Sequence, residues 1–259
     1  MKRLSILTVV MFVGGMVSAA VRTQEIDYRD GKTPLQGYLA YDDALQGIRP
    51  GVLVAHEWKG HGEYVRRRAR QLAEAGYVVF ALDMYGKGVF ANNHDEAAKL
   101  SGVYFKDRLL MRQRAQAGLN VLLKQPNVDT KRVAAIGYCF GGTTVLELAR
   151  AGTDLKGVAS FHGNLTTPVP AEPNKVKARV IVFQGGDDAW TLEGVPAFQE
   201  EMKKAGVDWQ MDIYGGAAHS FTVKEAGNDP STGMAYNEKA DRRSWESLMN
   251  FLHSVTSVD

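Results

Sequence analysis

Short apolar runs alternate with amphipathic stretches along most of this 259-residue chain, and this alternation restricts its fold more than any other feature. Apolar runs of this length are typical of strands buried on both faces, and helices between such strands imply a parallel sheet. The six runs are residues 51–55, 77–82, 133–136, 157–161, 180–183 and 209–214. We therefore expect six parallel strands.

The stretches between and after these runs have the pattern of helices, and Gly76, Gly152 and Gly206 follow three of them as C-terminal signals. The predicted helices are residues 63–75, 107–124, 141–151, 195–205 and about 235–253. A hairpin, residues 25–29 and 35–41 with a turn at Asp30-Gly31, precedes them. The sequence thus predicts a single α/β domain: a mostly parallel sheet with helices on both faces and an N-terminal hairpin. Sites in such sheets form at the carboxyl ends of strands.

The first twenty residues have the pattern of a signal peptide. Lys2 and Arg3 precede an uncharged apolar run over residues 4–17, and small residues follow at 18–20. The run is shorter than the roughly 20 apolar residues that span a bilayer, which disfavours an uncleaved membrane anchor. We expect a mature domain of residues 21–259 that is exported, periplasmic or secreted, with no stable membrane anchor.

Charge content narrows the class of binding partner, and cysteine content limits the possible roles of the thiol. Without Lys2 and Arg3, the chain has as many basic as acidic residues, which argues against a nucleic-acid partner. The arginines at 66, 67, 68 and 70 fit a solvated helix face. The single cysteine, Cys139, cannot form an internal disulfide, so its thiol is either buried and inert or chemically employed.

The strongest local signal surrounds Cys139. The segment Gly137-Tyr138-Cys139-Phe140-Gly141-Gly142 follows a predicted strand and opens a predicted helix, the context of a nucleophile elbow with Cys in place of Ser. A tight turn leaves no room for side chains at the flanking positions, which explains the glycines. The N-terminus of the helix then favours a thiolate.

Two later strand ends supply partners for this nucleophile. Asp187 and Asp188 follow the strand at 180–183, and His219 follows the strand at 209–214, so the chain order is nucleophile, acid, histidine, as in α/β-hydrolases. Asp188 fits the hydrolase spacing better than Asp187. His219 would transfer protons, and the aspartate would orient its ring. The backbone N–H groups of Phe140 and Trp58 are the expected oxyanion donors.

These motifs resemble the dienelactone hydrolase family in order and approximate spacing over nearly all of the mature chain. The resemblance rests on His56-Glu57-Trp58-Lys59-Gly60, Leu82-Asp83-Met84-Tyr85-Gly86, the cysteine elbow, the aspartate loop and His219-Ser220-Phe221. It implies that Cys139 is the nucleophile, that Asp188 and His219 are its partners, and that Glu57 is a carboxylate near the thiol. In that family the equivalent glutamate helps to produce the thiolate when substrate arrives.

The chain departs from that family where arginines hold the carboxylate of dienelactone. Lys87 stands near the first of these positions, and Val223, followed by Lys224, stands at the second. Lysine cannot reproduce the two-pronged arginine contact, so dienelactone itself is not the expected substrate. The candidate substrate-binding residues are Lys87, Tyr85, His162 and Phe221.

Other reactive groups give weaker signals. His56 and His61 are five residues apart, which on a helix does not form a zinc pair, so no metal is expected. No nucleotide-binding loop is present, so no organic cofactor is expected.

Together these features predict a hydrolase that cleaves a small ester or lactone through a Cys-His-Asp triad and a thioester intermediate. Its partner would be a small-molecule substrate, and the protein would be a monomer or a small homo-oligomer. The alternative is a catalytically silent binding protein with the same fold. A thiol redox protein is disfavoured because no second cysteine is present.

Overall fold

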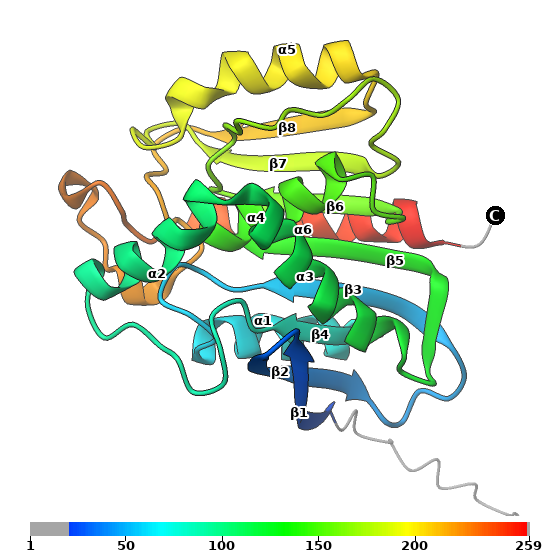
Figure 1. Ribbon diagram of the computed structural model, residues 1–259. Helices are drawn as coiled ribbons and strands as arrows, with labels where there is room; N and C mark the ends of the chain where they lie inside the picture. The colour runs from blue at the N-terminus through cyan, green and yellow to red at the C-terminus, as the bar shows by residue number, and fades with distance from the viewer. Residues whose placement is uncertain (1–20, 258–259) are drawn as a thin grey trace, which may run out of the picture.

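The computed structural model describes residues 21–257, which form an eight-stranded sheet in the order β1-β2-β4-β3-β5-β6-β7-β8 (Figure 1). The strands from β3 to β8 are parallel, whereas β2 is antiparallel to β1 and to β4. Their bounds are β1 Val21–Asp30, β2 Thr33–Asp42, β3 Arg49–Ala55, β4 Val78–Leu82, β5 Val128–Tyr138, β6 Gly157–Phe161, β7 Arg179–Gly185 and β8 Trp209–Tyr214. The predicted α/β fold with an N-terminal hairpin is confirmed.

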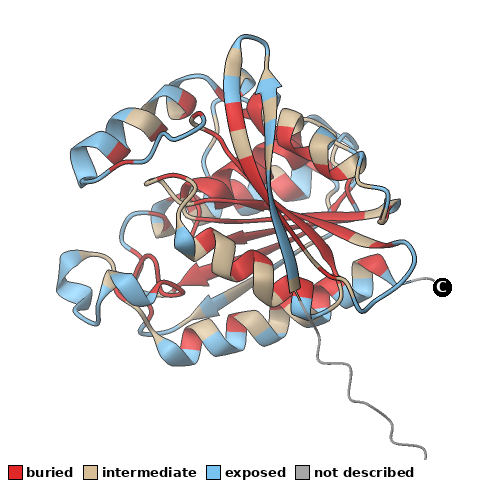
Figure 2. Ribbon diagram, turned by 90° about the horizontal axis from the view of Figure 1, so that it is seen from below, coloured by how far each residue is buried: buried red, intermediate tan, exposed pale blue. Residues whose placement is uncertain are grey.

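Helices cover both faces of the sheet. They are α1 Glu63–Glu74, α2 His94–Lys106, α3 Arg108–Leu123, α4 Phe140–Arg150, α5 Val195–Ala205 and α6 Glu238–Thr256. One apolar core contains side chains of α3, α4 and α5, and the other contains side chains of α1 and α6. Figure 2 shows the strands as a buried layer between these helices, whose outer surfaces are exposed.

The two cores explain the apolar runs in the sequence. In β3, Leu53 and Ala55 belong to one core, and Val52 and Val54 belong to the other, because successive strand side chains point to opposite faces. All four side chains are fully buried. A strand covered on both sides therefore has no polar alternation, and the run remains continuously apolar.

Helix α2 was not predicted. Its buried residues are only Ala97, Ser101 and Tyr104, so its apolar stripe is narrow and partly polar. A start signal does exist, because the side chain of Asn93 accepts a hydrogen bond from the Glu96 N–H. Helix α6 begins three residues later than predicted, at Glu238, where Asn237 caps it.

The interpretation of the arginine cluster as a solvated face is wrong for Arg68. This side chain is buried, forms an ion pair with Asp241, and lies over the rings of Tyr64, Tyr138 and Trp245. A charged residue can be buried when its charge is paired and its N–H groups are satisfied, a condition that local sequence does not reveal.

The predicted signal peptide, residues 1–20, lies outside the described residues. Within residues 21–257, no helix has the length and apolar character that crossing a bilayer requires.

Candidate active site

Cys139 lies at the turn between β5 and α4, with a positive φ of 53°. The flanking glycines are required by close approaches. A Cβ on Gly137 would lie 2.0 Å from the Gly141 carbonyl oxygen, and a Cβ on Gly141 would lie 2.2 Å from the Ala55 carbonyl oxygen. The elbow thus holds the Cys139 side chain at the carboxyl edge of the sheet in a backbone conformation that a non-glycine residue rarely adopts.

Three side chains from separate strand ends form one hydrogen-bonded chain. His219 follows β8, and its Nε2 lies 3.1 Å from the Cys139 Sγ. Its Nδ1 lies 2.8 Å from the Oδ2 of Asp188, which follows β7. Asp188 is fully buried, whereas Asp187 is exposed, so the structure places Asp188 rather than Asp187 against the imidazole.

This arrangement favours an imidazolium at position 219. Burial by itself lowers the pKa of His219, but the negative charge of the Cys139 thiolate and the hydrogen bonds to Asp188 and Cys139 outweigh burial. Together they raise the pKa of His219 to about 10. His219 is therefore protonated at neutral pH, with its Nε2 next to the Cys139 Sγ.

Glu57, at the end of β3, is a carboxylic acid in an unusual environment. Its Oε1 is buried and has no hydrogen-bond partner within residues 21–257. Burial raises the pKa of Glu57 to about 7, although the charges of His219 and Lys59 oppose the rise. Glu57 therefore changes its protonation state close to neutral pH.

The backbone of Glu57 is fixed by His56. The Met84 N–H donates to His56 Nε2 over 3.1 Å, so in the neutral ring Nδ1 carries the proton and donates to the Glu57 carbonyl oxygen over 2.6 Å. Burial lowers the pKa of His56, which keeps the ring neutral. His56 thus has a structural partner on both nitrogens.

The two N–H groups expected to bind an oxyanion have no hydrogen-bond partner among the described residues. Phe140 is the first residue of α4, so its N–H has no acceptor inside the helix. The Trp58 N–H likewise has no partner within the part of the chain that the structure describes. The carbonyl oxygen of Trp58 accepts a hydrogen bond from Tyr85 Oη over 2.8 Å, which orients this peptide.

A second layer of polar residues lies behind His219, and sequence analysis predicted of it only His162, as a substrate-binding residue. Tyr64 Oη is 2.6 Å from Thr222 Oγ1, which is 2.9 Å from His162 Nε2. Arg68 Nε donates to Tyr64 Oη over 3.2 Å. Burial, together with the charges of His219 and Arg68, keeps the pKa of His162 well below its usual value, so His162 is neutral.

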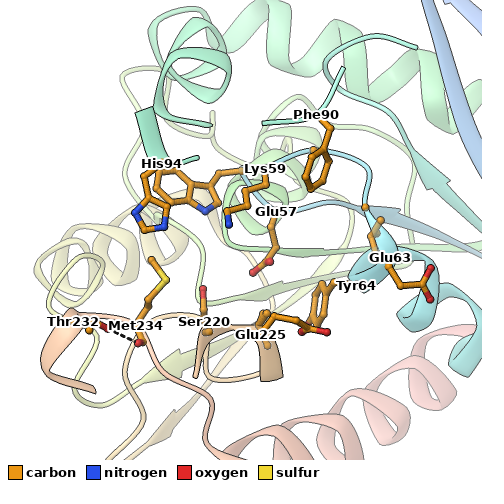
Figure 3. A pocket seen from close by; sticks show the side chains of 16 residues that line it. Glu57, Lys59, Glu63, Tyr64, Phe90, His94, Ser220, Glu225, Thr232 and Met234 are labelled. Atoms are coloured by element: carbon orange, nitrogen blue, oxygen red, sulfur yellow. Dashed lines mark hydrogen bonds between the residues drawn. The ribbon is translucent and has the colours of Figure 1, made fainter. Parts of the chain in front are cut away.

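A cavity of about 510 Å³ lies beside this site (Figure 3). Ser220, which follows His219 in the chain, and Glu57, whose charge interacts with His219, line it, whereas Cys139, Asp188 and His219 are not among the lining residues. Glu57, Trp58 and Ser220, which neighbour the triad in space or sequence, line its wall. Figure 3 shows Glu57 in the middle of this wall, between Lys59 on one side and Tyr64 and Ser220 on the other. The remaining lining residues are Lys59, Gly60, Gly62, Glu63, Tyr64, Val65, Phe90, His94, Val223, Glu225, Ala226, Thr232 and Met234.

The four predicted substrate-binding side chains do not line this cavity. Lys87 is exposed and paired with Asp27, and Tyr85 is engaged with Trp58. His162 and Phe221 are buried behind His219. Lys87 thus points to another surface and His162 and Phe221 point into the interior, whereas Tyr85 lies close enough to Cys139 for their charges to interact.

The residues that do form the wall come largely from loops and helix starts, such as Phe90, Glu225 and Met234. Such segments have no periodic pattern from which sequence analysis could place them. Within residues 21–257, no group of three or more His, Cys, Asp or Glu side chains is arranged to bind a metal ion.

Comparisons with known proteins show which proteins this chain resembles. The model of the dienelactone hydrolase family matches residues 35–256. A solved structure named m3DLH is 39% identical, with a TM-score of 0.87, and the match covers 92% of this chain and 100% of that chain. P91, a dienelactone hydrolase-like promiscuous phosphotriesterase from metagenomic libraries, is 37% identical, with a TM-score of 0.86, over 93% of this chain and 100% of its own.

A curated relative from Bradyrhizobium sp carries the name "Probable 2-oxo-3-(5-oxofuran-2-ylidene)propanoate lactonase". It is 26% identical over 246 residues, which cover 90% of this chain and 96% of that protein.

Proposed function

Because this chain belongs to the dienelactone hydrolase family and is a hydrolase of the ester or lactone type, we propose that it cleaves small carboxylic esters or lactones with Cys139 as nucleophile. The observation that carries this proposal is the chain of contacts from Cys139 Sγ to His219 and from His219 to Asp188. A nucleophile, a base and a group that orients the base are the parts that acyl transfer requires.

In the first half of the reaction, the Cys139 thiolate attacks the carbonyl carbon of the ester. The N–H groups of Phe140 and Trp58 donate to the oxygen as it becomes negative. The intermediate collapses by breaking the carbon–oxygen bond, and His219 Nε2 gives its proton to the departing alcohol. The products are a thioester on Cys139 and a neutral imidazole.

Water completes the cycle. His219 removes a proton from a water molecule, and the resulting hydroxide attacks the thioester carbonyl. The thiolate leaves as the carboxylic acid is released, and the proton stays on His219, so the thiolate–imidazolium pair is restored. Asp188 stabilises the protonated ring and fixes its orientation in both halves.

Glu57 has a supporting part in this proposal. It makes no hydrogen bond to Cys139 in the structure, but it lies on the cavity wall and titrates near pH 7. A carboxyl group in that state can take the proton of a neutral thiol when a substrate displaces solvent, as the family resemblance implies.

The alternative is a binding protein that keeps the fold without catalysis. The arrangement of Cys139, His219 and Asp188 argues against it, because a buried carboxylate and a paired imidazole are costly to maintain without use. We further propose that residues 1–20 direct export to the periplasm or the medium and are then removed. Mass measurement of the protein recovered outside the cytoplasm would reveal an N-terminus at Val21 if this is right.

The test of function is turnover of a panel of activated esters and lactones by the reduced mature protein and by Cys139→Ala. A phosphotriester belongs in the panel because the relative P91 is described as a promiscuous phosphotriesterase. We expect wild-type turnover, its loss in Cys139→Ala, and an acyl adduct by intact mass in the wild type. Equal turnover by both proteins would refute the thiol mechanism, and no turnover by either would favour the binding protein.

A further inference from the structure

The cavity beside the triad has an aromatic wall. Trp58, Tyr64 and Phe90 line it, and Figure 3 shows the ring of Phe90 on the side opposite Met234 and Thr232. Val65, Val223 and Ala226 add aliphatic surface. Apolar and aromatic lining of this kind favours an apolar ligand, because water leaves both surfaces when they meet.

Phe90 is held in place by two glycines. It forms an antiparallel bridge with Gly60, and a Cβ on Gly62 would lie 2.8 Å from the Phe90 ring. The absence of side chains at these two positions allows the ring to pack closely against the backbone. Phe90 is nevertheless 47% exposed, so part of its ring remains available at the cavity.

The charged groups on the wall are predominantly acidic. Glu57, Glu63 and Glu225 line the cavity, whereas Lys59 contributes the one Lys or Arg side chain among the lining residues that the structure describes. The charge of Lys59 acts on neighbouring Glu57 and is therefore offset locally. Glu63 and Glu225 each form an ion pair with an arginine, so among the described residues that line the cavity Glu57 is the carboxyl group without an ion pair.

Two arginines next to the wall are already engaged, Arg70 with Glu63 and Arg67 with Glu225. Arg67 donates to both carboxylate oxygens of Glu225, over 3.0 Å and 3.3 Å, and its guanidinium lies over the ring of Tyr64. Lys87, which the sequence suggested as a carboxylate ligand, forms its ion pair with Asp27 outside the cavity. No unpaired guanidinium is thus offered to an anionic substrate by the lining residues.

From these features we infer that the cavity selects uncharged esters with an aromatic or otherwise bulky apolar group, and that it discriminates against esters carrying a carboxylate. The inference rests on the proposed function and names its substrate class. A substrate carboxylate would lie against buried Glu57 and apolar side chains without a free guanidinium to pair with it, which opposes binding by on the order of tenfold.

The charge arm of the test compares the 4-nitrophenyl esters of adipic acid and of its monomethyl ester at pH 8. The two acyl groups have nearly equal length, and only the first is anionic. We expect kcat/KM for the ester of monomethyl adipate, the masked ester, to be at least about tenfold higher than kcat/KM for the ester of adipic acid. The ratio of the two values should shrink as salt is added, because salt screens the charges. Equal kcat/KM values, or a preference for the anion, would overturn the inference.

Two variants test which wall residue causes the preference against the anionic ester. Glu225→Gln removes a wall carboxylate and frees Arg67, so the preference against the anion should fall by about tenfold. Glu172→Gln is the matched control, because Glu172 is exposed and paired with Lys175 away from the cavity, and it should leave the ratio at the wild-type value. An unchanged ratio in Glu225→Gln would contradict the assigned source of the discrimination.

Phe90→Ala tests the second part of the inference, the preference for an aromatic or bulky apolar group. It should lower kcat/KM for 4-nitrophenyl 3-phenylpropanoate by about tenfold more than for 4-nitrophenyl acetate. Leu109→Ala, which truncates an exposed apolar side chain outside the cavity lining, is the control and should affect both substrates equally. Equal losses for both substrates in Phe90→Ala would refute this arm.

Binding separates failure of this inference from failure of the proposed function. Cys139→Ala is titrated with both adipate esters, with Trp fluorescence as the signal. A preference for the masked ester in Kd, without wild-type turnover, would refute the proposed function but retain the selectivity. Turnover that requires Cys139, without any charge preference in kcat/KM or Kd, would refute only the selectivity.

Discussion

The imidazole ring of His162 lies edge-on against that of His219, with ring centroids 5.2 Å apart and ring planes at 67°. His162 is buried and neutral, and Thr222 links it to Tyr64 on the cavity wall. The histidine proposed to transfer protons is therefore supported from behind by a polar chain that reaches the substrate cavity.

Thr222→Val should disturb this support. The change leaves Tyr64 Oη and His162 Nε2 without their shared partner, which should lower the free energy of unfolding by about 1–3 kcal/mol. We also expect kcat to fall by about tenfold with a smaller change in KM, and the pKa of His219 measured by NMR to shift. Thr222→Ser retains the hydroxyl and should restore kcat; if Val and Ser variants behave alike, the chain does not position His219.

Glu57→Gln should stabilise the protein in alkaline solution. The folded-state pKa of Glu57 is raised to about 7, so the folded protein binds more protons than the unfolded chain between pH 4.5 and 7, and stability falls as pH rises through this window. Glutamine carries no charge to bury. At pH 8 its free energy of unfolding should exceed that of the wild type by up to about 3 kcal/mol, and the two should converge below pH 4.5. Urea denaturation at several pH values measures this, and a constant difference would contradict it.

Asp188→Asn should destabilise the protein, most strongly near pH 6.5. The folded-state pKa of His219 is raised to about 10, so its protonation contributes stability that is complete below pH 6.5 and is lost as pH rises towards 10. Asparagine supplies no charge to the imidazolium. The free energy of unfolding of the variant should therefore lie furthest below the wild type near pH 6.5, with the gap narrowing by pH 10. A gap that widens over this range would refute the assignment.

Gly141→Ala should destabilise the elbow strongly. The added Cβ would lie 2.2 Å from the Ala55 carbonyl oxygen, so β3 and α4 would have to separate. We expect a loss of at least about 3 kcal/mol in the free energy of unfolding, or failure to fold. Gly102→Ala is the control: a Cβ there meets nothing within 4 Å on helix α2, and the change should stabilise by about 0.5–1 kcal/mol.

Local patterns predicted the parts of the fold that depend on local physics. Strands buried on both faces are continuously apolar, and the glycines of the elbow are imposed by contacts between near neighbours in sequence, such as Gly137 with Gly141. Chain order and loop spacing also indicated Asp188 and His219, which the structure brings together.

Features that depend on distant contacts were not predicted. Arg68 is buried because Asp241 and three aromatic rings surround it, and all of these partners except Tyr64 are far away in sequence. The same applies to Phe90 and Glu225 on the cavity wall and to the direction in which Lys87 points. Sequence spacing gives the strand end at which a residue lies, but the tertiary packing decides where its side chain points.

The division between strand ends and loops has an evolutionary consequence. Cys139, Asp188 and His219 are held by the ends of β5, β7 and β8, whereas much of the cavity wall comes from the segments around Phe90 and Met234. Mutations in those segments can alter which molecule is accepted while the bond-breaking groups keep their positions. New substrate ranges can therefore arise in descendants of this protein through substitutions in its loops, while the catalytic groups stay unchanged.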